Sequence, residues 1–296
     1  IVALFSALTG VLPIKGRVTV SAGLLDTLAT KNQASRSKFG PIDFMATHHY
    51  YFWSPLEKTV ILPMAAFGLS YGAFIGLIWP LIAMTFVYTL SYLIFFVKDT
   101  DIKLKRGEDE IKISRITRYV FPYILGIAAV ISGVNFLFVF SVLTIYYMIV
   151  TRTFDFKKLL RYVDWSIVAW VAGIIFLSNI VREHTNEITT FLGTTGLDIT
   201  TTFGFMAISG LSFIGAFVLG SSSRFGAITV LLASIYGIEY LPWFFAVDFA
   251  GYILSPMHKC VAIGKLYFGT KLSTYVKILS GWAGLLIVTA GGLLWI

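Results

Sequence analysis

The stretch that decides the fold is VILPMAAFGLSYGAFIGLIWPLIAMTFVYTLSYLIFF, from Val60 to Phe96, which contains no charged residue. A helix rises about 1.5 Å per residue, so about 20 residues cross a hydrocarbon layer of about 30 Å. The stretch is too long for one crossing, and the small residues of Gly68-Leu-Ser-Tyr-Gly72 predict a turn near its middle. We therefore expect two helices within a lipid bilayer.

Further uncharged runs follow along the chain, at residues 120–150, 166–181, 200–223 and 278–296. The first of them breaks at Ser132-Gly-Val-Asn135, which predicts two more helices. None alternates polar and apolar residues as a transmembrane β-strand does. Over the whole chain 57% of residues are hydrophobic and 13% are charged, against roughly 25% charged in soluble domains. The composition predicts an all-α polytopic membrane protein and gives no sign of nucleic-acid binding.

Basic residues mark the cytoplasmic side of a membrane protein. With paired helices in the runs 60–96 and 120–150, the loops 31–58, 98–118 and 151–163 share one side, and residues 259–277 join them. These four segments hold 19 of the 23 lysines and arginines. We therefore place these four segments in the cytoplasm.

Two apolar regions are interrupted by polar residues in the middle. Residues 1–30 contain Pro13-Ile-Lys-Gly-Arg17, and residues 202–237 contain Gly220-Ser-Ser-Ser-Arg224. We interpret both as re-entrant hairpins that open to opposite sides, which is typical of the inverted repeats of transporters.

The hairpins divide the chain into two repeats. The first, residues 1–97, has the hairpin 1–30, an interfacial stretch 31–58 with the aromatic cluster His48-His-Tyr-Tyr-Phe-Trp53, and helices over 59–97. Residues 98–118 form a cytoplasmic loop. The second repeat, residues 119–296, has the hairpin 202–237, a helix over 240–258, an interfacial stretch 259–277 and a last helix over 278–296.

Several short motifs lie at these hairpins and at the helix after the second one. They are Ala7-Leu-Thr-Gly-Val-Leu-Pro13, Val20-Ser-Ala-Gly-Leu-Leu-Asp26, Ser209-Gly-Leu-Ser-Phe-Ile-Gly215 and Phe249-Ala-Gly-Tyr-Ile-Leu-Ser-Pro-Met-His258, which runs on to Tyr267-Phe268. With them the chain resembles a family of uncharacterised archaeal and bacterial integral membrane proteins in the ion transporter superfamily. Relatives there include gluconate, citrate, dicarboxylate and arsenite carriers. The resemblance implies an elevator-like carrier fold that holds its substrate between hairpin tips.

The chain departs from that family in two respects. It begins on Ile1, almost at the first hairpin, where members of the family usually have preceding helices, and Lys15 and Arg17 replace small residues after the first proline. The first departure suggests a truncated or split protein with an incomplete first repeat. The second suggests a changed or lost substrate site.

Candidate substrate-binding residues gather at the two hairpin tips. Arg224 is the strongest candidate, because an arginine at membrane depth is costly unless it faces a cavity or a partner. Its guanidinium can hold a carboxylate or oxyanion in a bidentate manner. Ser221, Ser222 and Ser223 add hydroxyl groups, and Lys15, Arg17 and Thr9 form the opposing half. The alternative interpretation is that Arg224 lies in a short external loop and that the basic pair flanks a cytoplasmic turn.

Asp26, Asp248 and His258 are the candidate ion-coupling residues. Lone acids in apolar stretches commonly carry a proton or bind sodium, although pairing with a nearby donor explains them equally well. His258 titrates near neutrality, but next to Lys259 it also suits a helix end. The adjacent His48 and His49 suit the membrane interface, and the single cysteine, Cys260, suits a small buried position. We expect no metal site and no cofactor.

These observations favour a secondary transporter of a small anion or organic acid coupled to H⁺ or Na⁺, as a homodimer or with other membrane subunits. The rival hypothesis is a subunit that descends from such a carrier, no longer transports and scaffolds a larger membrane complex. An enzyme is not expected, because the spacings assemble no nucleophile with its base, no cluster of metal ligands and no cofactor motif.

Overall fold

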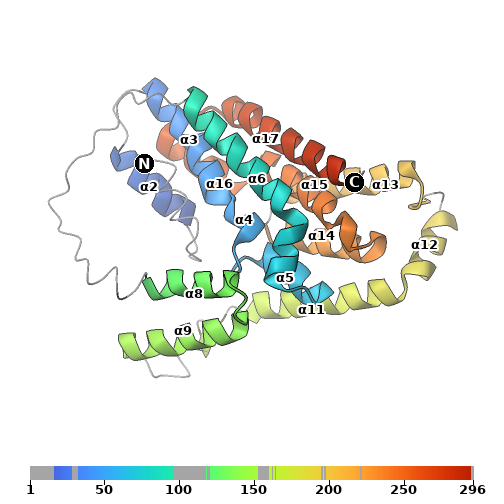
Figure 1. Ribbon diagram of the computed structural model, residues 1–296. Helices are drawn as coiled ribbons and strands as arrows, with labels where there is room; N and C mark the ends of the chain where they lie inside the picture. The colour runs from blue at the N-terminus through green and yellow to red at the C-terminus, as the bar shows by residue number, and fades with distance from the viewer. Residues whose placement is uncertain are drawn as a thin grey trace.

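The computed structural model describes residues 17–28, 33–96, 118, 121–152, 160–161, 163, 165–194, 196, 198–220 and 222–294, and each regular element within them is a helix (Figure 1). The first half holds α2 (Arg17–Leu28), α3 (Gln33–His48), α4 (Tyr50–Trp53), α5 (Lys58–Phe67), α6 (Tyr71–Phe96), α8 (Phe121–Ile131) and α9 (Phe136–Thr151). The second half holds α11 (Trp165–Glu183), α12 (Thr185–Thr194), α13 (Thr202–Leu219), α14 (Ser222–Tyr236), η1 (Ile238–Tyr240), α15 (Leu241–Leu254), α16 (Lys259–Phe268) and α17 (Leu272–Leu293). The expected all-α class is confirmed.

Three helix breaks expected from the sequence are present. Gly68 ends α5 and Gly220 ends α13, each in the left-handed conformation, with φ of 63° and 53°. Such a φ favours glycine, which has no Cβ to clash with its own backbone. Between α8 and α9, the side chain of Asn135 accepts hydrogen bonds from the amides of Leu137 and Phe138 and caps α9. Local sequence signals are sufficient to define all three.

Helices α6, α13 and α17 are long and apolar enough to cross a bilayer. By contrast α5, with its ten residues, is about 15 Å long, roughly half of the hydrocarbon layer, so it cannot cross alone. The placement of the basic loops on one side assumed two crossings between residues 60 and 96, and it stays a prediction. The last helix also begins earlier than expected, at Leu272 rather than at residue 278.

The side chains of α13 divide into an outward and an inward face. Leu211, Ile214 and Val218 are each more than half exposed, at 60%, 55% and 60%. Ser209 and Ser212 are buried on the other side of the helix. An apolar outer face with hydroxyl groups inside is the reverse of a water-soluble helix, and it suits a helix that faces lipid.

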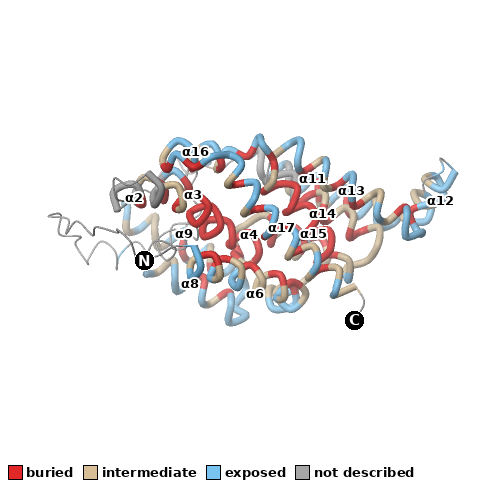
Figure 2. The backbone as a smooth tube through the Cα atoms, turned by 90° about the horizontal axis from the view of Figure 1, so that it is seen from above, coloured by how far each residue is buried: buried red, intermediate tan, exposed pale blue. Residues whose placement is uncertain are grey.

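The centre of the bundle is α15, which packs against α13, α14 and α17 (Figures 1 and 2). Each of its residues from Leu241 to Ile253 is buried. Residues 39–52, part of the stretch expected at the membrane interface, are buried as well. Phe52 of α4 packs against Phe245 and Phe249 of α15, with ring centroids 5.2 and 4.7 Å apart. Aromatic packing against α15 therefore holds the aromatic cluster that begins at His48 inside the protein.

Two stretches of chain, residues 54–71 and 255–272, have the same local structure. Ser54 ends α4 and Ser255 ends α15 in extended conformations, with ψ of 121° and 128°. The hydroxyl of each serine accepts a hydrogen bond from the amide two residues further on. A helix of ten residues follows in both stretches, α5 or α16, and ends at a left-handed glycine, Gly68 or Gly269.

The helices that adjoin these stretches also correspond. Tyr51 and Tyr252, which lie 201 residues apart, share a hydrogen bond of 3.0 Å between their hydroxyls. Helices α6 and α17, which follow the two stretches, lie side by side and run in opposite directions (Figure 1). Their antiparallel register is set by hydrogen bonds from Tyr88 to the Ile278 carbonyl, 2.6 Å long, and from Trp282 to the Thr85 hydroxyl, 3.4 Å long.

Candidate functional site

Asp248 lies in the middle of α15 with none of its surface exposed. One carboxylate oxygen accepts a hydrogen bond from the Ser212 hydroxyl of α13. The other accepts one from the Thr229 hydroxyl of α14, at 2.6 Å. The carboxylate therefore joins three helices of the second half of the chain, α13, α14 and α15.

The close approach of α13 to α15 depends on Gly251, one helical turn after Asp248. A Cβ at this position would lie 2.4 Å from the backbone oxygen of Phe213 and 3.0 Å from the Ala216 side chain. Only glycine leaves room for that oxygen. Small residues at such contacts are typical of helices packed within membranes.

The buried Asp248 carboxylate is costly in its ionised form. Transfer of an isolated charge into an apolar interior costs a large free energy, which two hydroxyl donors offset only in part. Binding of a proton or of an alkali cation to Asp248 removes the net charge. In segments buried in a membrane, such acids commonly mark ion pathways.

A cavity of about 570 Å³ lies at the start of α13, and Trp243, on the same helix as Asp248, is part of its wall. Its walls include Thr200, Thr201, Tyr236, Tyr240 and Trp243. The Trp243 indole donates a hydrogen bond of 2.8 Å to the hydroxyl of Ser209, which lies one turn before Ser212 on α13. Hydroxyl groups therefore extend from the cavity wall toward the carboxylate.

Asp198 directly precedes two residues of the cavity wall, Ile199 and Thr200. Its carboxylate accepts hydrogen bonds from the hydroxyl and the amide of Thr200, at 2.6 and 2.9 Å. These bonds stabilise the ionised form and lower the pKa of Asp198 below its usual value. An ionised carboxylate at the entrance attracts cations.

A second buried acid, Asp43 on α3, is 1% exposed. It accepts a hydrogen bond from the Ser21 hydroxyl of α2. In both halves of the chain an acid on a buried helix is therefore bound to a hydroxyl on the helix that precedes it. Sequence reasoning missed Asp43 because it lies in a stretch with many polar residues, where a lone acid does not stand out.

The break between α13 and α14 lies against the two stretches with matching local structure, residues 54–71 and 255–272. A Cβ at Gly220 would lie 2.7 Å from the Ser255 hydroxyl and 3.0 Å from Met257. A Cβ at Gly226, in the second turn of α14, would lie 3.2 Å from Thr59 at the start of α5. The start of α14 is thus close to both of these stretches.

All seven expected substrate-binding residues lie outside the part of the chain whose side chains are described. Thr9, Lys15 and Ser221 are outside it altogether. Arg17 begins α2, and Asp26 lies within it; Ser222, Ser223 and Arg224 form the first turn of α14, and for all five only the backbone is described. Their roles stay predictions.

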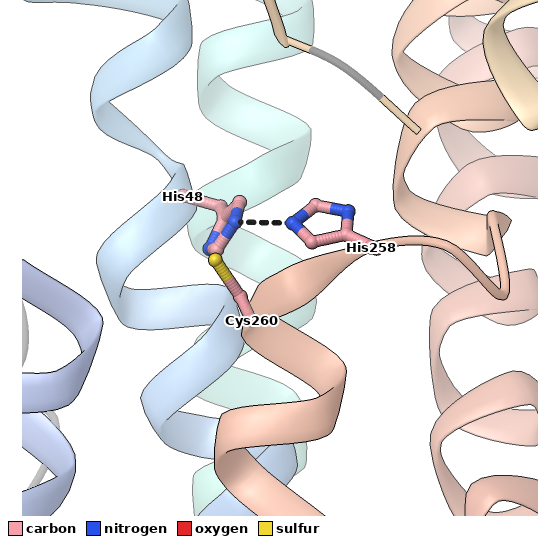
Figure 3. A group of neighbouring side chains, drawn as sticks. All are labelled: His48, His258 and Cys260. Atoms are coloured by element: carbon pink, nitrogen blue, oxygen red, sulfur yellow. Dashed lines mark hydrogen bonds between the residues drawn. The ribbon is translucent and has the colours of Figure 1, made fainter. Parts of the chain in front are cut away.

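His258 precedes α16 and is 2% exposed, and it lies beside residues that the sequence does not connect with it. Its Nε2 is 3.1 Å from the Nε2 of His48 on α3, which lies 210 residues away, and Cys260 adjoins both (Figure 3). We expected His48 at the membrane interface and no cluster of metal ligands. The spacing in the chain gives no signal for this cluster, because it forms only where α16 packs on α3.

The comparison with known families covers nearly the whole chain. The family described as "Protein of unknown function (DUF401)" matches residues 1–295. The chain belongs to this family. Neither a curated protein nor a solved structure matches it.

Proposed function

We propose that the protein is a secondary transporter of a small anion or organic acid, coupled to H⁺ or Na⁺. The observation that carries the proposal is the buried Asp248 carboxylate, held by hydroxyls from the two helices on either side of the Gly220 break. The proposed location is the plasma membrane of a prokaryote, with the basic loops in the cytoplasm.

The matched stretches 54–71 and 255–272 support an inverted repeat. Equivalent helices of an inverted repeat run in opposite directions, as α6 and α17 do. The Tyr51–Tyr252 hydrogen bond joins residues at equivalent positions, as a contact on a pseudo-twofold axis would. Further support comes from the packing of α5 on α14 and of α16 on α2, which pairs corresponding elements across the two halves.

The anion site that we propose is at the Gly220 break. A helix amino terminus carries partial positive charge, and the first turn of α14 adds the cationic residue Arg224. The Ser255 turn lies near Gly220, and Thr59 at the start of α5 lies near Gly226 in the next turn of α14, so both halves of the chain approach this point. In inverted-repeat carriers the substrate binds near the membrane midplane, between such elements.

Asp248 is the proposed coupling residue. A proton or Na⁺ that enters past Asp198 and the threonine-lined cavity neutralises the carboxylate. Because the charge is removed, the hydroxyls of Ser212 and Thr229 are freed to rearrange, and α13 and α14 can move relative to α15. Ion binding and movement of the hairpin are linked through these two hydrogen bonds.

The test is uptake of radiolabelled small anions, such as gluconate, citrate and succinate, into proteoliposomes with an imposed H⁺ or Na⁺ gradient. The variant is Asp248→Asn, which keeps the shape of the side chain and removes its charge. The matched control is Glu187→Gln, the same chemical change on a side chain that is 71% exposed. We expect uptake by the wild type and the control, and a loss of gradient-driven uptake in Asp248→Asn.

Uptake by Asp248→Asn at the wild-type rate would contradict the coupling role. Absence of uptake by the folded wild type for each tested anion, together with purification in a fixed ratio with other membrane chains, would favour the scaffold subunit instead. The size-exclusion profile in detergent establishes folding in each case.

A further inference from the structure

The cluster of His48, His258 and Cys260 joins the two halves of the chain. His48 belongs to α3, and the other two residues lie at the start of α16, which packs on α3 (Figure 3). Both imidazoles are buried, at 0% and 2% exposure, whereas Cys260 is partly exposed. One nitrogen of each ring and the cysteine sulfur lie within 4.8 Å of one another.

The hydrogen bonds of the two rings define where their protons lie. The Nδ1 of His48 is 2.6 Å from the Phe44 carbonyl oxygen, and the Nδ1 of His258 is 3.0 Å from the Tyr252 carbonyl oxygen. A carbonyl oxygen only accepts, so each Nδ1 carries the ring proton. In the neutral rings both Nε2 atoms therefore present a lone pair, and these lone pairs face each other across 3.1 Å.

Two opposed lone pairs repel each other, and a proton donor or a cation close to both of them removes the repulsion. Histidines that bind a metal usually donate their other N–H to a backbone carbonyl, which is the arrangement of both rings here. Two imidazole nitrogens on one tetrahedral Zn²⁺, with bonds of about 2.0 Å, lie about 3.3 Å apart. The observed 3.1 Å is close to this value.

The thiolate of Cys260 limits which metal ions the cluster would favour. A thiolate favours Zn²⁺ and Cu⁺ over Mg²⁺ and Ca²⁺, which prefer oxygen ligands. Two imidazoles and one thiolate form a three-ligand zinc set with a fourth position open to water. Cys260 is the most exposed of the three residues, so the open position is on its side of the cluster.

We propose that His48, His258 and Cys260 bind one Zn²⁺ ion that ties α16 to α3. The ion replaces the repulsion between the two Nε2 atoms with two bonds, so that zinc stabilises the contact between the halves of the chain. This role is independent of the transported solute.

The experiment measures zinc per chain on the purified, full-length protein in detergent. The protein is stripped with a chelator, incubated with ZnCl₂, dialysed and assayed by plasma mass spectrometry. The variants are Cys260→Ser and His258→Gln, and the control is His184→Gln, a histidine outside the cluster whose side chain is 57% exposed. Loading with Co²⁺ gives a second signal, because a cobalt–thiolate bond has a characteristic ultraviolet charge-transfer absorption.

We expect one zinc per chain in the wild type and in His184→Gln, and at least tenfold weaker binding in both cluster variants. The cobalt–thiolate absorption disappears in Cys260→Ser, and zinc raises the unfolding midpoint of the wild type but not of that variant. Zinc binding by folded Cys260→Ser that equals the wild type, or no stoichiometric binding by the wild type, would overturn the proposal. Loss of zinc in His184→Gln would reveal an adventitious ion only. Circular dichroism checks the fold, and Cys260→Ser decides the matter if His258→Gln does not fold.

Discussion

Substitution of Gly251 by alanine tests whether the contact between α13 and α15 shapes the Asp248 site. The added Cβ would lie 2.4 Å from the Phe213 carbonyl oxygen, whereas ordinary contact begins near 3.4 Å. The two helices must therefore separate by about 1 Å, since the obstacle is backbone. The same shift would lengthen the bond of 2.8 Å between Trp243 and Ser209 beyond the range of a hydrogen bond.

The expected cost has two parts. Overpacking of a close contact costs about 1–3 kcal/mol, and each weakened hydrogen bond adds about 1 kcal/mol. With two such bonds, Trp243–Ser209 and Ser212–Asp248, we expect Gly251→Ala to lower the free energy of unfolding by about 3–5 kcal/mol. It should also reduce gradient-driven uptake, because Ser212 moves away from Asp248. The assay is equilibrium unfolding in detergent followed by circular dichroism.

The matched control is Gly210→Ala on the outer face of α13, where a Cβ meets nothing within 4 Å. This variant should be as stable as the wild type or slightly more stable, because alanine favours a helix over glycine. If Gly251→Ala unfolds at the same midpoint as Gly210→Ala, the two helices are not in the close contact described, and the argument for the positioning of Ser212 fails.

Two further predictions concern stability elsewhere. A Cβ at Gly264 of α16 would lie 1.8 Å from the hydroxyl of the buried Tyr275, so Gly264→Ala should cost about 1–3 kcal/mol in unfolding free energy. Combination with Tyr275→Phe, which removes that hydroxyl, should recover part of the lost stability. If the effects of the two substitutions are simply additive, the clash does not exist. Asn135→Ala removes the cap of α9 and should lower the unfolding free energy by about 1 kcal/mol, whereas Asn135→Asp, which keeps an acceptor, should retain most of it in the same measurement.

The local sequence determines the class of the protein and many of its helix ends. The uncharged runs, the glycines at 68 and 220 and the cap at Asn135 act through nearby residues, so their effects can be recognised without knowledge of the packing. Asp248 can also be recognised as a candidate from the sequence alone, because an acid in an apolar stretch is costly wherever that stretch is buried.

The partners of these residues are decided only by the tertiary structure. Ser212 and Thr229 reach Asp248 from other helices, and His48 meets His258 from 210 residues away. The aromatic segment around Tyr51, which suited a membrane interface, is buried because α15 packs on it. Hydrophobic periodicity reports the face that a helix buries, but not the helix that covers it. Which distant side chains meet depends on how closely the helices pack, and here glycines such as Gly251 permit that approach.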